Sequence, residues 1–221
     1  MYYIFIGITV LITLGAQSFL DTTYKKCNQM KNKKGIIGKD VARTILDSNG
    51  LNHISLEETT GYLSDHYDSK NKVIRLSSSI YKESSVAAIS VAAHECGHAI
   101  QDKNGYFFLR LRHTITPLVN LASYAGYIAI MIGLFSALTK LIWIGIICEM
   151  VILGFQIITL PVEFNASQRG LKQLQDLDLV SNEDLPYCRR MLKAAALTYV
   201  AATATAAMEV LRLLMMVKRR D

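Results

Sequence analysis

The chain has four cysteines in 221 residues and no CxxC pair. That spacing favours free thiols on a reducing side of a membrane over a disulfide framework. The chain also lacks any recognisable RNA- or DNA-binding pattern, although its formal net charge is +6. Most basic residues lie beside apolar blocks, where they more simply set membrane orientation or contact anionic lipid. No nucleic-acid partner is therefore expected.

Charge is missing from several long stretches, and this decides the class of the protein. The mean hydropathy is +0.25 and hydrophobic residues make up 51% of the chain, which is high for a soluble enzyme. The uncharged or weakly charged blocks are Tyr2–Phe19, Ile115–Leu138, Leu141–Leu160 and Ala194–Val217. Blocks of this length can cross a bilayer as helices. We therefore expect a mainly α-helical membrane protein, with three to four transmembrane helices and a small unit outside the apolar blocks.

No lysine or arginine precedes the first block, although Ala16-Gln17-Ser18 resembles a signal-peptidase site. A signal peptide would carry basic residues there, so the block is interpreted as an uncleaved anchor. A cluster of lysines follows it: Lys25, Lys26, Lys31, Lys33, Lys34 and Lys39. The positive-inside rule then places the C-terminal end of the anchor in the cytoplasm. If the last block also spans, its basic end Lys218-Arg219-Arg220 breaks this rule, so its topology stays open.

The central motif is His94-Glu95-Cys96-Gly97-His98, which has the HExxH spacing. On a helix, this spacing places both histidines on one face, one turn apart. Two imidazoles so placed can bind one zinc ion, and the neighbouring glutamate can reach a zinc-bound water as general base. Cys96 is expected to point away from this face. Because the spacing also arises by chance on amphipathic helices, a third ligand is needed.

The residues around the motif predict a helix over Val86–Gln101, because they include many alanines and no proline. Ser84 or Ser85 can cap its start, and Asn104-Gly105 can end it.

Before this helix, Lys39–Ser48 reads as a short amphipathic helix. Two further stretches, Tyr62–Tyr67 and Lys72–Leu76, predict a hairpin with a short turn. An exposed strand edge beside a zinc helix can hold an extended peptide by backbone hydrogen bonds. A small sheet that merely covers the helix is the alternative, and the sequence does not choose between them.

Zinc in a hydrolytic site needs three protein ligands and an open position. The candidates for the third ligand are His53, His66, His113, Glu149, Glu163, Glu209 and several aspartates. If the HExxH helix is cytoplasmic, the second block leaves the cytoplasm and the third returns to it, which brings Glu163 back to the zinc helix. Glu149 would lie about 21 Å earlier along a straight helix. Glu163 is therefore favoured, and its alternative role is an interfacial carboxylate paired with Arg169 or Lys172.

Other polar residues keep more than one interpretation. Glu149 is an ionisable group in an apolar block, and such groups often have a function. For Glu149 we favour instead a buried acid that is paired with another span, for example with Arg212, or that faces a small aqueous pocket. The role of Glu209 stays open. A peptidase also needs a donor to the oxyanion of the tetrahedral intermediate. The candidates are His66, His113, Tyr67, Tyr106 and Arg169.

Several stretches together resemble the YugP-type neutral zinc metallopeptidases of bacterial membranes. They are Asp65-His66-Tyr67-Asp68 with Leu76-Ser77, then Ala93–Gln101, then Leu160–Ser167, with the anchor before them and two spans between the last two. The likeness runs along nearly the whole chain. It implies a membrane-bound zinc metallopeptidase with His94 and His98 as ligands, Glu95 as catalytic base and Glu163 as carboxylate ligand.

More distantly, the layout looks like HtpX-type membrane proteases and gluzincins, whose ligand helix usually reads E-x-x-x-D. Here Ser167 stands four positions after Glu163. The acid that would orient a histidine ligand is therefore missing. Ser167 or Asn165 could replace it by hydrogen bonding.

These interpretations predict five segments along the chain. Residues 1–20 form a membrane anchor, 21–114 a zincin-like α+β catalytic region, and 115–160 a transmembrane hairpin. Residues 161–193 form the third-ligand helix and a loop, and 194–221 a C-terminal apolar helix. Pro161 is expected to interrupt the third span.

The expected function is hydrolysis of peptide bonds in peptides or membrane proteins at one catalytic zinc ion. The resemblance implies a bacterial plasma membrane, and the lysine cluster implies a cytoplasmic active site. One alternative is a non-catalytic, zinc-stabilised membrane scaffold or accessory factor, against which Glu95 argues because a structural site needs no base. Another is a site-2-type intramembrane protease, but Val86–Gln101 is too short to span and Asp176–Leu179 lies in a polar stretch. Substrate identity and oligomeric state are not predicted.

Overall fold

The computed structural model describes residues 2–136 and 138–218. The chain divides into two compact units. One, the mixed unit, comprises Ser18–Tyr106 and Val162–Ala196, and the other, the helical unit, comprises residues 1–17, 107–161 and 197–221. Arg219 and Arg220, named above for the orientation of the last block, lie outside the described residues.

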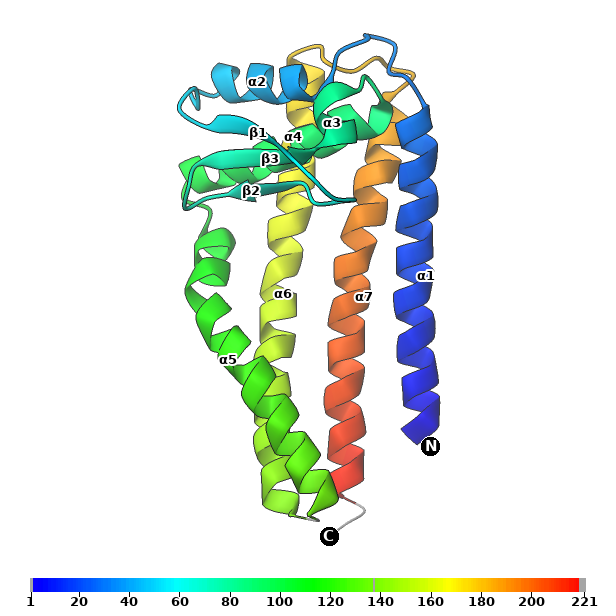
Figure 1. Ribbon diagram of the computed structural model, residues 1–221, viewed down its shortest axis with the longest axis vertical. Helices are drawn as coiled ribbons and strands as arrows, with labels where there is room; N and C mark the ends of the chain where they lie inside the picture. The colour runs from blue at the N-terminus through cyan, green and yellow to red at the C-terminus, as the bar shows by residue number, and fades with distance from the viewer. Residues whose placement is uncertain (1, 137, 219–221) are drawn as a thin grey trace. The chain divides into compact units, whose positions relative to one another are not determined.

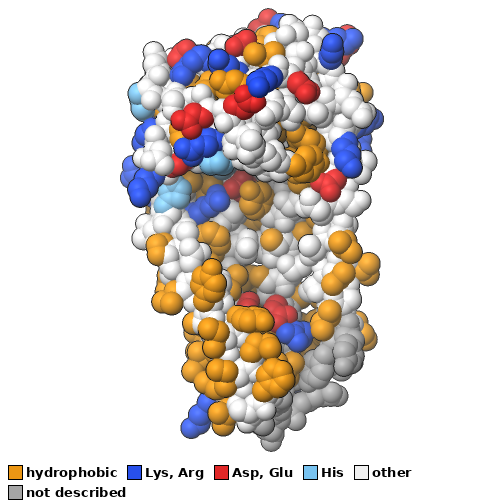
Figure 2. All heavy atoms as spheres, in the orientation of Figure 1, with side chains coloured by type: hydrophobic (Ala, Val, Ile, Leu, Met, Phe, Trp, Pro, Cys, Tyr) orange, Lys and Arg blue, Asp and Glu red, His pale blue; other side chains and the backbone are white. Residues whose placement is uncertain are grey.

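Four long helices are apolar enough to cross a membrane, counted over the part of the chain that is described. They are α1 (Tyr2–Gln29), α5 (Phe107–Phe135), α6 (Thr139–Asp176) and α7 (Leu185–Val217) (Figure 1). Large hydrophobic side chains lie on their surfaces, as Figure 2 shows; Tyr124 is 76% exposed and Leu121 66%. Such exposure is costly in water and favourable in hydrocarbon. The predicted class, a mainly helical protein with membrane-spanning helices, is confirmed, with four candidate spans.

Two boundaries differ from the sequence prediction. Pro161 does not interrupt the third span, because α6 continues through it to Asp176. A proline inside a helix loses one backbone hydrogen bond, but in an apolar segment the remaining backbone groups still need helical partners. Helix α7 begins at Leu185, so Pro186–Lys193 and Ala194–Val217 form one helix.

Small residues allow α5 and α6 to pack closely within the helical unit. A Cβ added at Gly126 would lie 2.7 Å from Cβ of Cys148, and one at Gly133 would lie 2.8 Å from Cγ1 of Ile142. Small residues at such positions are what lets two membrane helices approach each other closely.

The mixed unit contains the remaining helices and a three-stranded sheet. Its helices are α2 (Gly38–Ser48), α3 (Ser78–Lys82) and α4 (Val86–Lys103), and its strands are β1 (Ser55–Thr59), β2 (His66–Asp68) and β3 (Val73–Ser77) (Figure 1). The strand order is β1-β3-β2, with β1 parallel and β2 antiparallel to the central β3. The hairpin prediction is confirmed by the β2–β3 pair, and β1 was not predicted.

The core of the mixed unit forms where α2 packs on α4. The predicted apolar face of α2, which consists of Val41, Ile45 and Leu46, is fully buried, and so is the neighbouring Ala42. Most of α4 is buried as well, including its alanines. A helix held on several sides is a rigid platform for the HExxH motif.

Candidate metal centre

Helix α4 begins and ends at the residues that the sequence indicates. The Oγ of Ser85 accepts a hydrogen bond from the backbone N–H of Ala88 at 3.0 Å, which is an N-cap. Asn104 is the C-cap, and Gly105 follows with φ +62°, a left-handed conformation that favours glycine. The caps therefore fix the register in which the two histidines are presented.

Two glycines bring the backbones of α4 and α6 into contact. A Cβ added at Gly97 would lie 2.2 Å from the carbonyl oxygen of Ala166, and one at Gly170 would lie 2.6 Å from that of Ala93. Glu163 lies on α6 one turn before Ala166. The glycine contacts thus allow the α6 carboxylate to reach the histidine face of α4.

The three predicted ligands converge. Oε2 of Glu163 lies 3.3 Å from Nε2 of His94 and 3.5 Å from Nε2 of His98. Donor atoms of the three residues all lie within 4.8 Å of one another, so they could hold a metal ion. Two ligands about 2.0–2.1 Å from a tetrahedral zinc ion are themselves separated by about 3.4 Å. The observed separations and the donor chemistry therefore both fit zinc.

The Nδ1 atoms of both histidines contact neutral oxygens. Nδ1 of His94 lies 3.1 Å from Oγ of Ser167, and Nδ1 of His98 lies 3.1 Å from Oε1 of Gln101. Contacts of this kind orient metal-binding imidazoles. Ser167 therefore occupies the place of the acid that the wider group would supply, as the sequence suggested it could.

The electrostatics of the centre favour positive charge. Burial alone would lower the pKa of His98, but the hydrogen bond and charge of Glu163, with the charge of Glu95, outweigh it and raise that pKa. The same negative charges that hold a proton on His98 would attract a metal cation.

Glu95 lies on α4 next to His94. Its side chain is buried in α4, and β2 packs against α4. Burial raises the pKa of Asp65, next to the start of β2, and the charge of Glu95 raises it further. Asp65 is held in place by Ser77, whose backbone N–H donates to Oδ1 at 2.7 Å. Glu95 is therefore close enough to the start of β2 to act on Asp65 electrostatically.

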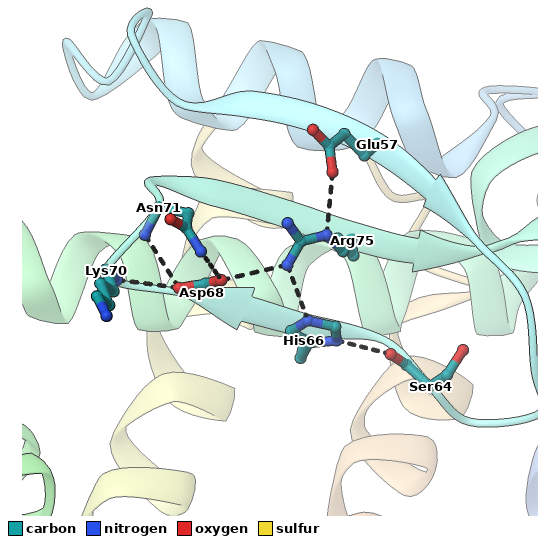
Figure 3. A network of polar contacts seen from close by, with 7 residues as sticks. All are labelled: Glu57, Ser64, His66, Asp68, Lys70, Asn71 and Arg75. Atoms are coloured by element: carbon teal, nitrogen blue, oxygen red, sulfur yellow. Dashed lines mark hydrogen bonds and ion pairs between the residues drawn. The ribbon is translucent and has the colours of Figure 1, made fainter.

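The other candidates in the mixed unit have different partners. His66 lies on the sheet, where Nδ1 is 2.8 Å from the carbonyl oxygen of Ser64 and Nε2 is 3.5 Å from Nη1 of Arg75 (Figure 3). Tyr67 donates its hydroxyl proton to Asp102 at 2.8 Å.

His53 also has a place apart from the three ligands. It lines a small cavity of about 110 Å³ with Tyr67 and Lys72.

Arg169, a candidate oxyanion donor, donates from Nε to Oδ1 of Asn165 at 2.6 Å. The described contacts therefore do not select an oxyanion donor from the predicted set.

Three further candidates belong to the helical unit: His113, Glu149 and Glu209. Arg212 donates from Nε to Oε2 of Glu209 at 2.8 Å, and Glu149 interacts electrostatically with both. The ion pair of Arg212 is therefore with Glu209, and the pairing of Glu149 with Arg212 that was expected stays a prediction.

Sequence reasoning missed Gln101. Its side chain is fully buried, and its Nε2 donates to the carbonyl oxygen of Val162 at 2.8 Å and to Oδ1 of Asn165 at 3.1 Å. The available signal was its position three residues after His98, which places both on one face of a helix.

Comparisons with known proteins show which family the chain resembles. The model of a family described as "Putative neutral zinc metallopeptidase" matches residues 2–218. A Bacillus subtilis (strain 168) protein named "Putative membrane protease YugP" is 40% identical over 216 residues, which cover 97% of this chain and 96% of that protein. No solved structure matches the chain. These matches confirm the resemblance and its zinc cofactor.

Proposed function

This chain belongs to the neutral zinc metallopeptidase family, and we propose that it is a membrane-bound endopeptidase with a catalytic zinc ion held by His94, His98 and Glu163. The observation that carries the proposal is the convergence of two imidazoles and one carboxylate from two helices. The bacterial relative is named as a membrane protease, and four helices of this chain can cross a membrane.

Glu95 is assigned as the general base. Bound zinc would polarise a peptide carbonyl and lower the pKa of a water in its open position towards about 7. Glu95 follows His94 in the chain and is buried, and the helix that carries both packs against β2. Its carboxylate accepts a proton from the attacking water and passes it to the leaving amine. Glu163 supplies one negative charge, so the ligand set leaves the centre a net charge of +1 beside a developing oxyanion.

Strand β2 is the assigned binding edge for the substrate. It is the outer, antiparallel strand of the sheet as described, and it packs against α4. The residue before β2, Asp65, interacts electrostatically with Glu95. A peptide that adds to this edge by backbone hydrogen bonds would pass close to the base, largely independent of its sequence. The substrate class is therefore extended segments of peptides and membrane proteins.

The active site is assigned to the cytoplasmic side of the plasma membrane. The support is the run of lysines that follows the first apolar block, with Lys25 and Lys26 exposed at the end of α1. Helix α4 is absent from the four candidate spans found among the described residues, which disfavours a zinc site inside the bilayer.

A Glu95→Gln variant tests the proposal. The purified full chain in detergent or lipid should bind one zinc ion and cleave fluorophore-labelled casein. Glu95→Gln should keep its zinc and lose about 10²–10⁴-fold in cleavage rate, because only proton transfer is removed. Glu83→Gln, which changes an exposed acid of the same unit, should behave like the unaltered protein.

Two outcomes would overturn the proposal. Full cleavage by Glu95→Gln with bound zinc would exclude this residue as base. Stoichiometric zinc in the unaltered chain without any cleavage would instead support the alternative of a non-catalytic, zinc-stabilised scaffold.

A further inference from the structure

We infer that Gln101 and Ser167 are positioning residues, and that this centre holds both histidine ligands by neutral oxygens rather than by carboxylates. The inference rests on the proposed zinc site and extends it to the residues behind the ligands. It is carried by a chain of hydrogen bonds whose direction can be worked out residue by residue.

The series of hydrogen bonds starts at Arg169, whose guanidinium can only donate. Its Nε lies 2.6 Å from Oδ1 of Asn165. Oδ1 must therefore be the acceptor, and this fixes which way the Asn165 amide points. The same Oδ1 has a second lone pair, which is available to another donor.

Gln101 supplies that donor. Its Nε2 lies 3.1 Å from Oδ1 of Asn165 and 2.8 Å from the carbonyl oxygen of Val162. Both neighbours are acceptors, so both amide protons of Gln101 are used there. Its side-chain oxygen must then face the opposite way, towards His98.

This orientation selects the tautomer of His98. Oε1 of Gln101 lies 3.1 Å from Nδ1 of His98 and can only accept, so Nδ1 carries a proton. In a neutral imidazole, the lone pair is then on Nε2. Nε2 is the atom that lies 3.5 Å from Oε2 of Glu163. A fully buried amide thus presents the correct nitrogen of His98 to a metal.

His94 is supported differently. Its Nδ1 lies 3.1 Å from Oγ of Ser167, and its Nε2 lies 3.3 Å from Oε2 of Glu163. A hydroxyl fixes the ring by one hydrogen bond but adds no charge. A carboxylate at this place would increase the electron donation of the imidazole to the metal. We therefore expect moderate zinc affinity, with room for improvement at Ser167.

The experiment measures zinc affinity of the full chain by chelator competition, independently of peptide cleavage. Gln101→Leu, which keeps the bulk and removes all three hydrogen bonds, should weaken zinc binding by about 10–100-fold. Asn165→Asp keeps an acceptor for both Arg169 and Gln101, so it should stay within about threefold of the unaltered affinity. Circular dichroism of the zinc-free proteins checks that each variant remains folded.

Two substitutions of Ser167 should change the zinc affinity in opposite directions. Ser167→Ala should weaken zinc binding, and Ser167→Asp, which restores the acid behind His94, should strengthen it. Ser90→Ala is the matched control, because Ser90 is a fully buried serine of α4 whose hydroxyl donates to the backbone of Val86. It should leave the affinity unchanged.

The outcomes separate this inference from the proposed function. If the unaltered chain binds zinc and Gln101→Leu binds it equally well, the inference is wrong and the proposed function stands. Equal losses of zinc affinity in Gln101→Leu and Asn165→Asp would also overturn it. Asn165→Asp keeps the acceptor oxygen for Arg169 and Gln101, so an equal loss could not be caused by the removal of these hydrogen bonds. If the unaltered chain binds no zinc, the proposed function itself fails.

Discussion

The close contact at Gly97 makes a prediction in which metal binding fails before the fold does. In Gly97→Ala, the new Cβ would lie 2.2 Å from the carbonyl oxygen of Ala166 and 2.9 Å from its carbonyl carbon. Non-bonded heavy atoms pack at roughly 3.5–4.0 Å. Because the obstructing atoms belong to the α6 backbone, no side chain can turn away, and the helices must separate by about 1 Å.

The expected cost follows from this displacement. Overpacking of this kind typically costs about 1–3 kcal/mol in the free energy of unfolding, which a well-packed unit can survive. Metal coordination is stricter, since ligand distances are held within about 0.2 Å. Glu163 is carried on α6 and the histidines on α4, so the same shift separates the ligands. We expect zinc affinity to fall by at least about 100-fold.

The assay combines thermal unfolding of the zinc-free chain with chelator competition for zinc. The control is Gly154→Ala on α6, the helix that carries Glu163, where an added Cβ would meet nothing within 4 Å. Exchange of glycine for alanine at an open helical position stabilises by about 0.5–1 kcal/mol, so this variant should unfold slightly later and bind zinc normally. Unchanged zinc affinity in Gly97→Ala would refute the packing argument.

Two predictions concern pH. Zinc must displace the proton from His98, whose pKa is raised by Glu163 against the opposing effect of burial, so apparent zinc affinity should fall as pH drops through and below the usual histidine range; chelator competition at several pH values checks this, and a flat profile would contradict it. At the β2–β3 turn, hydrogen bonds from Asn71, and then from Arg75, hold the pKa of Asp68 well below its usual value (Figure 3). Its contribution to stability should therefore be present above about pH 4 and be lost as pH falls below that. Hydrogen exchange of the hairpin should show this loss, and Asp68→Asn should remove the pH dependence; an unchanged profile in that variant would exclude Asp68 as the cause.

Local signals made much of the fold predictable. Long apolar runs with few or no charges revealed the four long helices, and the spacing of Val41, Ile45 and Leu46 revealed α2. Both signals arise from neighbours in the sequence, which a pattern can report. The caps of α4 were predictable for the same reason.

Strand β1 was missed because its strand character depends on a distant partner. Its sequence, Ser55–Thr59, is largely polar and exposed, and it pairs in parallel with β3, from which β2 separates it in the sequence. With one apolar residue in five, this stretch shows no alternation of apolar and polar residues that would indicate a strand. The prediction that Pro161 interrupts the third span was wrong for a different reason. It applied a rule for helices in water to an apolar segment.

The ligands were predictable but their supports were only partly so. His94 and His98 were predicted from their spacing, and Glu163 from the expected return of the chain to the same side of the membrane. Gln101 has no such signature, because its role depends on two acceptors contributed by α6. Ser167 was recognised as a departure from a pattern, and its contact with His94 required the structure.

The cysteine inside the HExxH motif has a consequence for redox chemistry. Cys96 is fully buried against α2, with Sγ 3.6 Å from the carbonyl oxygen of Ala42, and burial raises the pKa of its thiol. Oxidants and alkylating reagents act on exposed thiolates, and this side chain offers neither exposure nor charge. A metal centre with a cysteine between its histidines is thus inert to thiol oxidation. The chemistry of the metal centre should therefore be the same whether the compartment that it faces is oxidising or reducing.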